Sequence, residues 1–96
     1  MELVKTQFQE WLESKEPDCR VGVAKMDNIC PIAMYLKAYT GISYDIGARM
    51  YRKTGKEAGE RLPKWVQEFV MRADSYGRMT PVTARSALDI LSRCEE

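Results

Sequence analysis

The period of the apolar residues changes along the chain, and this change constrains the fold more than any other feature. Four segments carry apolar residues three or four positions apart, which is the spacing of one helix face. They are residues 2–14, 31–39, 63–75 and 81–94. Residues 42–53 alternate apolar and polar positions instead, which is typical of a half-buried strand. The chain is therefore expected to mix helices and strands.

Residues at the ends of these segments support the assignment. Pro31 suits a first helical position, because its missing N–H would have no helical partner there, and Gly41 suits the position after a last turn. Thr80 is expected to cap the last helix, with Pro81 at its first position. Gly47 interrupts the alternating segment, which predicts a bulge or a hairpin turn there.

Two shorter segments complete the expected fold. Residues 20–24 predict a short strand, although Gly22 inside it is unfavourable. Residues 54–60 hold two glycines and no apolar pattern and predict an exposed loop. We therefore expect an α+β fold of about four helices with a small antiparallel sheet or hairpin. With 96 residues the chain has room for one hydrophobic core, so residues 1–96 are expected to form a single compact domain.

The most continuous apolar stripe belongs to the third expected helix. Its large members, Trp65 and Phe69, are expected to be buried in the core. There they should face Phe8 or Trp11 of the first helix, or Leu88 of the last.

The composition argues against several kinds of chemistry. The chain has no histidine, its cysteines lack the C-x-x-C spacing of a metal site, and it carries no phosphate-binding glycine loop. We therefore expect no cofactor, no metal and no enzymatic activity. Three cysteines without a framework spacing indicate a reducing compartment, so the cytoplasm is the expected location. The sequence shows no signal peptide and no membrane segment.

Cys30 is the residue with the most reactive potential, and two interpretations of it stay open. At the cap of the second helix, its thiolate would be stabilised by backbone N–H groups and by the helix dipole. Between Ile29 and Ile32, it would instead be a small buried apolar residue that reacts slowly. We expect the second, with Cys94 near the end of the last helix reacting fastest.

Charge is uneven along a chain whose net charge is +1. Residues 1–18 carry a net charge of −3, whereas residues 49–64 carry a net charge of +4. The candidate binding residues in the basic segment are Arg49, Arg52, Lys53 and Lys56. With Tyr44 and Tyr51 as stacking groups, they could bind a phosphate backbone or an acidic protein. The alternative is a solvated hairpin and loop whose charges maintain solubility.

The last two expected helices, with the short turn between them, are compatible with two interpretations. They match a helix-turn-helix in outline, and Thr83, Arg85 and Ser86 supply polar residues at the start of the second helix. Asp89 on the same helix opposes a phosphate backbone. An ordinary pair of helices packed on the core is therefore the favoured interpretation.

Three stretches of the chain also carry a resemblance. They are Cys30-Pro31-Ile32-Ala33-x-Tyr35-Leu36, then Leu62-Pro63-x-Trp65-x-x-x-Phe69-Val70, then Thr83-Ala84-x-x-Ala87-Leu88-x-Ile90-Leu91. Their order, which touches about half of the chain, resembles small uncharacterised proteins of bacteria and their phages. The resemblance implies a prokaryotic source and no activity.

These observations predict a small non-enzymatic protein-interaction module, of the accessory or regulatory kind. Its expected partner is another protein or a second copy of itself, with no membrane involved. The alternative is a nucleic-acid-binding protein that uses the basic segment 49–64 or the C-terminal helix pair.

Overall fold

The computed structural model describes residues 3–26, 28–77 and 79–94. Within these residues the chain forms four helices and two antiparallel sheets, so the expected α+β fold is confirmed. The elements in chain order are α1 (Lys5–Glu13), β1 (Arg20–Val23), α2 (Pro31–Thr40), β2 (Tyr44–Ile46), β3 (Met50–Lys53), β4 (Gly59–Arg61), α3 (Lys64–Asp74), β5 (Pro81–Thr83) and α4 (Ala84–Ser92).

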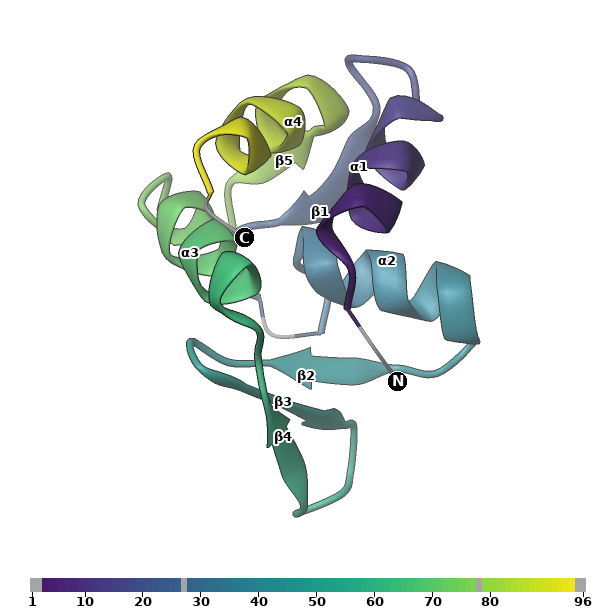
Figure 1. Ribbon diagram of the computed structural model, residues 1–96, viewed down its shortest axis with the longest axis vertical. Helices are drawn as coiled ribbons and strands as arrows, with labels where there is room; N and C mark the ends of the chain where they lie inside the picture. The colour runs from purple at the N-terminus through teal and green to yellow at the C-terminus, as the bar shows by residue number, and fades with distance from the viewer. Residues whose placement is uncertain (1–2, 27, 78, 95–96) are drawn as a thin grey trace.

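The helices and the larger sheet occupy different ends of the molecule. In Figure 1, α1, α3 and α4 lie in the upper half together with the sheet of β1 and β5. The three-stranded sheet lies at the lower end, in the order β2-β3-β4, and α2 runs between the two regions. β4 is the edge strand that reaches farthest from the helices (Figure 1). None of the described helices has the length and apolar character that crossing a bilayer requires.

One prediction for the last helix is wrong, because residues 81–83 form strand β5. Val82 is fully buried and lies opposite Gly22 of β1. The Ala24 N–H donates to the Thr80 carbonyl at 2.9 Å, which extends the pairing beyond the strand. These contacts with a distant segment hold the backbone extended, although Thr80 and Pro81 favour a helix start locally.

Helix α4 therefore begins three residues later than expected. Its cap is Thr83, whose hydroxyl accepts a hydrogen bond from the Ser86 N–H at 3.2 Å. The hydroxyl of Thr80 instead donates to the Tyr76 carbonyl at 2.8 Å, behind the end of α3. A threonine hydroxyl does cap the last helix, but the threonine is Thr83 and not the expected Thr80.

The hairpin expected at Gly47 is confirmed. β2 and β3 pair with Tyr44 opposite Lys53 and Ile46 opposite Tyr51, and the Gly47 N–H donates to the Met50 carbonyl at 2.8 Å.

The exposed loop expected at residues 54–60 is partly wrong. Its last two residues, Gly59 and Glu60, belong to β4, which pairs with β3. The hydroxyl of Tyr51 donates to the Glu60 carboxylate at 2.9 Å, and the Leu62 N–H donates to the Arg49 carbonyl at 2.8 Å. These bonds fix a strand that has no apolar alternation of its own.

The core is built around the ring of Phe8, which is fully buried. Its ring lies 5.2 Å from that of Phe69, 5.8 Å from that of Trp65 and 5.2 Å from that of Tyr35, measured between centroids. The expected burial of Trp65 and Phe69 against α1 is confirmed. Trp11 is partly buried at the edge of the same cluster.

Candidate functional site

The basic segment forms β3, β4 and the connection between them. Arg49 lies in the turn before β3, Arg52 and Lys53 lie in β3, and Lys56 lies in the loop that leads to β4. All four side chains are exposed to solvent. The structure therefore places two of the four candidate residues on the three-stranded sheet and two in the turns beside it, at the end of the molecule opposite α1 and α4 (Figure 1).

The sheet has an inner face that packs on the core and an outer face that meets solvent. Tyr51 and Ile46 lie opposite each other and are both buried, so their side chains define the inner face. Because side chains alternate along a strand, Lys53 projects from the same face as Tyr51, and Arg52 projects from the outer face. Two neighbouring cations in the sequence thus lie on different faces of the sheet.

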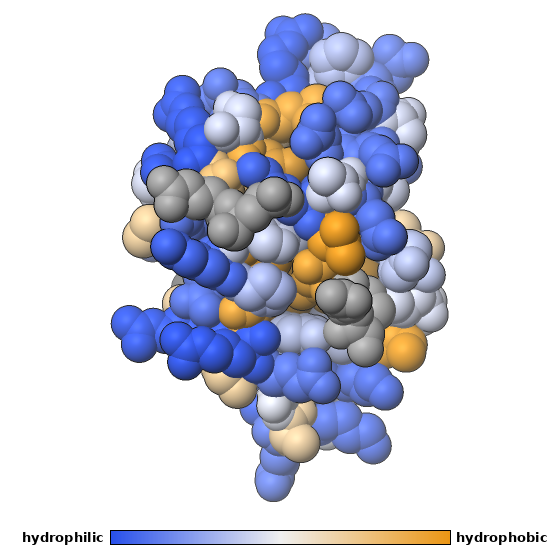
Figure 2. All heavy atoms as spheres, viewed as in Figure 1, coloured by the Kyte–Doolittle hydropathy of each residue, from blue (hydrophilic) through white to orange (hydrophobic). Residues whose placement is uncertain are grey.

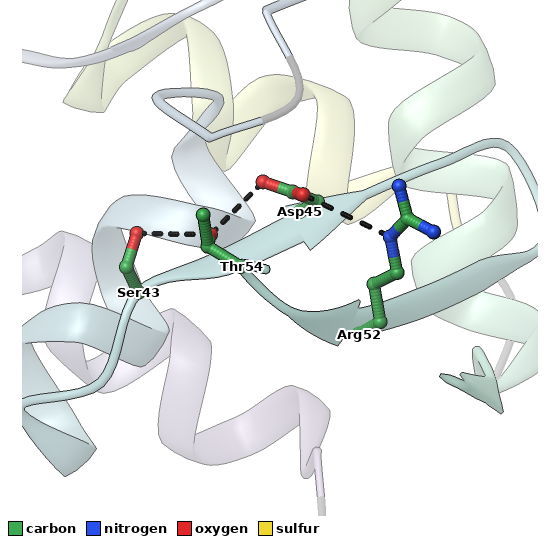
Figure 3. A network of polar contacts seen from close by, with 4 residues as sticks. All are labelled: Ser43, Asp45, Arg52 and Thr54. Carbon is green, nitrogen blue, oxygen red and sulfur yellow. Dashed lines mark hydrogen bonds and ion pairs between the residues drawn. The ribbon is translucent and has the colours of Figure 1, made fainter. Parts of the chain in front are cut away.

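On the outer face, Arg52 belongs to a polar network that the sequence analysis missed (Figure 3). Its Nε lies 3.8 Å from Asp45 Oδ2, and the Thr54 hydroxyl donates to Asp45 Oδ1 at 3.0 Å. The Thr54 hydroxyl also lies 3.2 Å from that of Ser43. Asp45 partly neutralises Arg52, so Arg52 is less available to a binding partner. The alternation of polar Ser43, just before β2, and Asp45 within it is the signal in the sequence that indicates such a network.

A groove of about 620 Å³ opens between the start of β2 and the β3–β4 region. Apolar and basic side chains share it: its lining includes Ile42, Tyr44, Tyr51, Ala58, Lys53 and Lys56. Three of the four candidate residues, Arg52, Lys53 and Lys56, therefore line a mainly apolar groove rather than an open polar surface.

Tyr44 and Tyr51 were expected to supply stacking groups for nucleic acid, and the structure corrects this. Each side chain is only 6% exposed, and the two rings lie 5.7 Å apart between centroids. Burial, together with the hydrogen bond to the Glu60 carboxylate, raises the pKa of Tyr51 to about 12. The tyrosines are part of the core, so little of either ring is available for stacking on a base.

Several cations around this sheet form no ion pair with any described carboxylate. Among the described residues, no ion pair forms with Arg49, Lys53, Lys56 or Arg61. Figure 2 shows mostly hydrophilic residues over the lower end of the molecule, where Figure 1 places β3 and β4. The surface thus carries positive charge that the fold itself does not neutralise.

The C-terminal helix pair does not present a free recognition helix. The Ala84 N–H donates to the Cys19 carbonyl at 2.9 Å, and the Arg85 N–H donates to the Pro17 carbonyl at 3.0 Å. The loop between α1 and β1 therefore covers the N-terminal end of α4. Strand β5 also replaces the first three residues expected in the last helix and separates α3 from α4. This geometry favours the interpretation as helices packed on the core.

Cys30 occupies the cap position of α2, as its place before Pro31 predicted. Its backbone carbonyl accepts the Met34 N–H at 2.9 Å, but its side chain makes no capping hydrogen bond. The residue is 9% exposed and lies on the wall of a cavity of about 600 Å³ that Lys25 and Asp74 also line. Cys30 thus lies at the cap of α2, as the first interpretation expects, and is buried, as the second expects.

The structure changes the expected order of cysteine reactivity. Cys94 is 4% exposed, its thiol lies 3.4 Å from the Ile90 carbonyl, and burial raises its pKa. Cys19 is exposed. In a timed alkylation of the native protein near neutral pH, with each site assigned by mass spectrometry, we expect Cys19 to react first and Cys30 and Cys94 to lag. Faster labelling of Cys30 than of Cys19 would instead indicate a thiolate stabilised by the helix start.

Within the described residues, no group of three or more cysteine, aspartate or glutamate side chains could hold a metal ion. No protein-family model, curated protein sequence or solved structure matches this chain. Function is therefore inferred from the basic sheet and its groove.

Proposed function

We propose that this protein is a non-enzymatic binding module that recognises an acidic segment of a partner protein on its three-stranded sheet. The supporting observation is the set of exposed cations Arg49, Lys53, Lys56 and Arg61, which have no ion-pair partner among the described residues. A partner's carboxylates would supply the missing charge, and its apolar side chains would enter the adjacent groove.

A protein partner fits this surface better than nucleic acid does. Binding to single strands combines backbone charge with aromatic stacking, and the two tyrosines of this sheet are buried. Glu57 and Glu60 also lie among the cations, where they would repel a continuous row of phosphates. A peptide can place its carboxylates between such groups, because its charge need not be continuous.

The cytoplasm is part of the same proposal. No disulfide joins Cys19, Cys30 and Cys94, all of which lie within the described residues. The absence of disulfides among these thiols is compatible with a reducing compartment.

The test uses a variant that reverses three cations of the site, Arg49→Glu, Lys53→Glu and Lys56→Glu. The matched control reverses three exposed cations elsewhere, Arg20→Glu, Lys37→Glu and Arg72→Glu, so both proteins have the same net charge. The probe is a blocked octapeptide that alternates glutamate and valine, and binding is measured by fluorescence anisotropy. We expect the site variant to bind at least about tenfold more weakly than the control, since exposed ion pairs contribute up to about 1 kcal/mol each and three attractive contacts are replaced by repulsive ones.

The same measurement with single-stranded and duplex DNA and RNA as probes tests the alternative function. If the sheet binds duplex DNA, affinity should fall with salt at a log–log slope near about −0.9 per phosphate contact. Replacing Arg49, Arg52 and Lys53 by alanine should flatten that slope. Tight, salt-dependent nucleic-acid binding without peptide binding would replace the proposal with the nucleic-acid function.

A further inference from the structure

Strand β4 leaves one edge of the three-stranded sheet open. Among the described strands, β4 pairs with β3 and has no neighbour on its other side. All three of its residues, Gly59, Glu60 and Arg61, are exposed. An open strand edge carries a row of backbone donors and acceptors onto which another strand can be added.

The hydrogen-bond pattern shows which groups of β4 face outward. In an antiparallel pair, the residues that bond to the partner strand alternate with residues that point away from it. The Leu62 N–H donates to the Arg49 carbonyl. Leu62 and Glu60 therefore direct their backbone groups toward β3, and Gly59 and Arg61 direct their N–H and carbonyl groups away from the sheet.

The two faces of the sheet differ beside this edge. Arg61 lies opposite Met50 of β3, and alternation places both on the outer face with Arg52. Glu60 lies opposite Tyr51 on the inner face, where the groove opens. An added strand would thus meet the cation Arg61 on its outer side, and on its inner side a mainly apolar groove that Lys53, Lys56 and Glu60 also line.

We infer that β4 is a strand-addition site for an extended peptide in which acidic residues alternate with apolar ones, an inference that rests on the proposed function. The acidic side chains would lie beside Arg61 on the outer face. The apolar side chains would lie on the inner face, where Ile42 and Ala58 line the groove. Backbone bonds to Gly59 and Arg61 would hold the peptide in register.

Probe peptides with selected N–H groups removed test this binding mode. In an antiparallel addition, the glutamates of the alternating octapeptide lie opposite Gly59 and Arg61, so their N–H groups face β4. Three of its glutamates are N-methylated in one derivative and three of its valines in another, which leaves charge and composition equal. We expect the glutamate-methylated peptide to bind at least about tenfold more weakly, the loss expected for one or two hydrogen bonds, and the valine-methylated peptide to bind as the parent does.

A pair of variants tests the same mode from the side of the protein. Arg61→Ala removes the cation, and Arg61→Pro removes the outward N–H as well. Proline is tolerated at this position of an edge strand because the N–H is not needed for pairing with β3. We expect Arg61→Pro to weaken peptide binding about tenfold beyond Arg61→Ala, with both variants giving the circular dichroism spectrum of the native protein.

The outcomes separate this inference from the proposed function. Equal binding of both methylated peptides, still lost in the variant with Arg49, Lys53 and Lys56 reversed, would overturn strand addition and leave the acidic-partner proposal standing. Absence of binding of the parent peptide would overturn both. Self-association that Arg61→Pro abolishes and that the peptide does not displace would assign the edge to a second copy of the chain, and would also overturn the inference.

Discussion

Replacing Phe69 by alanine is expected to lower the free energy of unfolding by about 3–5 kcal/mol. The side chain is 1% exposed, and its ring meets that of Phe8 edge to face at 5.2 Å between centroids. The truncation removes this contact and opens a cavity between α1 and α3. Small domains are stable by about 5–15 kcal/mol, so the loss is a large part of the total. Denaturant unfolding followed by tryptophan fluorescence measures it.

Two further variants control for effects unrelated to the cavity. Phe69→Leu keeps most of the buried volume and should lose much less stability than Phe69→Ala. Tyr39→Ala removes an aromatic ring of similar size that is 60% exposed, and it should also cost little. A Phe69→Ala protein with the unfolding midpoint of the native protein would contradict the central place of Phe69 in the core.

The helices could be predicted because each one carries its own signal. The stripe of Trp65, Phe69 and their neighbours has helical spacing, and α3 buries that side. Pro31 and Gly41 mark the two ends of α2, where Gly41 has the left-handed φ of 76° that favours glycine. Signals of this kind depend only on neighbouring residues, so they can be recognised without knowledge of the rest of the fold.

Strands β4 and β5 could not be predicted, because what holds each of them is a partner distant in the sequence. Val82 pairs with Gly22 of the distant strand β1, whereas local chemistry at Thr80 and Pro81 favours a helix. Glu60 lies in a stretch without an apolar pattern, so its pairing with Tyr51 cannot be recognised from the sequence. Short strands with two or three pairs have too little pattern of their own to be recognised.

The positive charge of the candidate site could be predicted from the sequence, but the directions of its side chains could not. Arg49, Lys53 and Lys56 are exposed cations in or beside one sheet, as a basic segment suggests. The alternation from Ile42 to Met50 does not show that Tyr51 turns inward, because the hairpin turn pairs Ile46 with Tyr51 and leaves Met50 on the outer face. The same limit applies to Cys94, whose burial depends on how α4 packs on the core.

Gly22 is the position where a single added methyl group is expected to do the most harm. A Cβ at this residue would lie 2.4 Å from the Pro31 nitrogen and 2.7 Å from the Cys30 carbonyl carbon. Both atoms belong to the backbone at the start of α2, so no side chain can move aside. The glycine that is unfavourable for strand β1 in isolation is therefore required by the close approach of α2.

Gly22→Ala is expected to lower the free energy of unfolding by at least about 1–3 kcal/mol, the cost of forcing extra volume into a packed core. Gly55→Ala is the control: its Cβ would meet no atom within 4 Å, but its φ of 85° is strained for alanine. It should cost about 1–2 kcal/mol, from backbone strain alone.

Denaturant unfolding compares the stability of the two variants, and timed alkylation of Cys30 reports on the start of α2. Because Gly22→Ala pushes the start of α2 away from β1, Cys30 should react faster with the alkylating reagent in that variant. Its reaction rate should stay unchanged in Gly55→Ala. Native stability and native Cys30 reactivity in Gly22→Ala would show that β1 and α2 do not approach this closely.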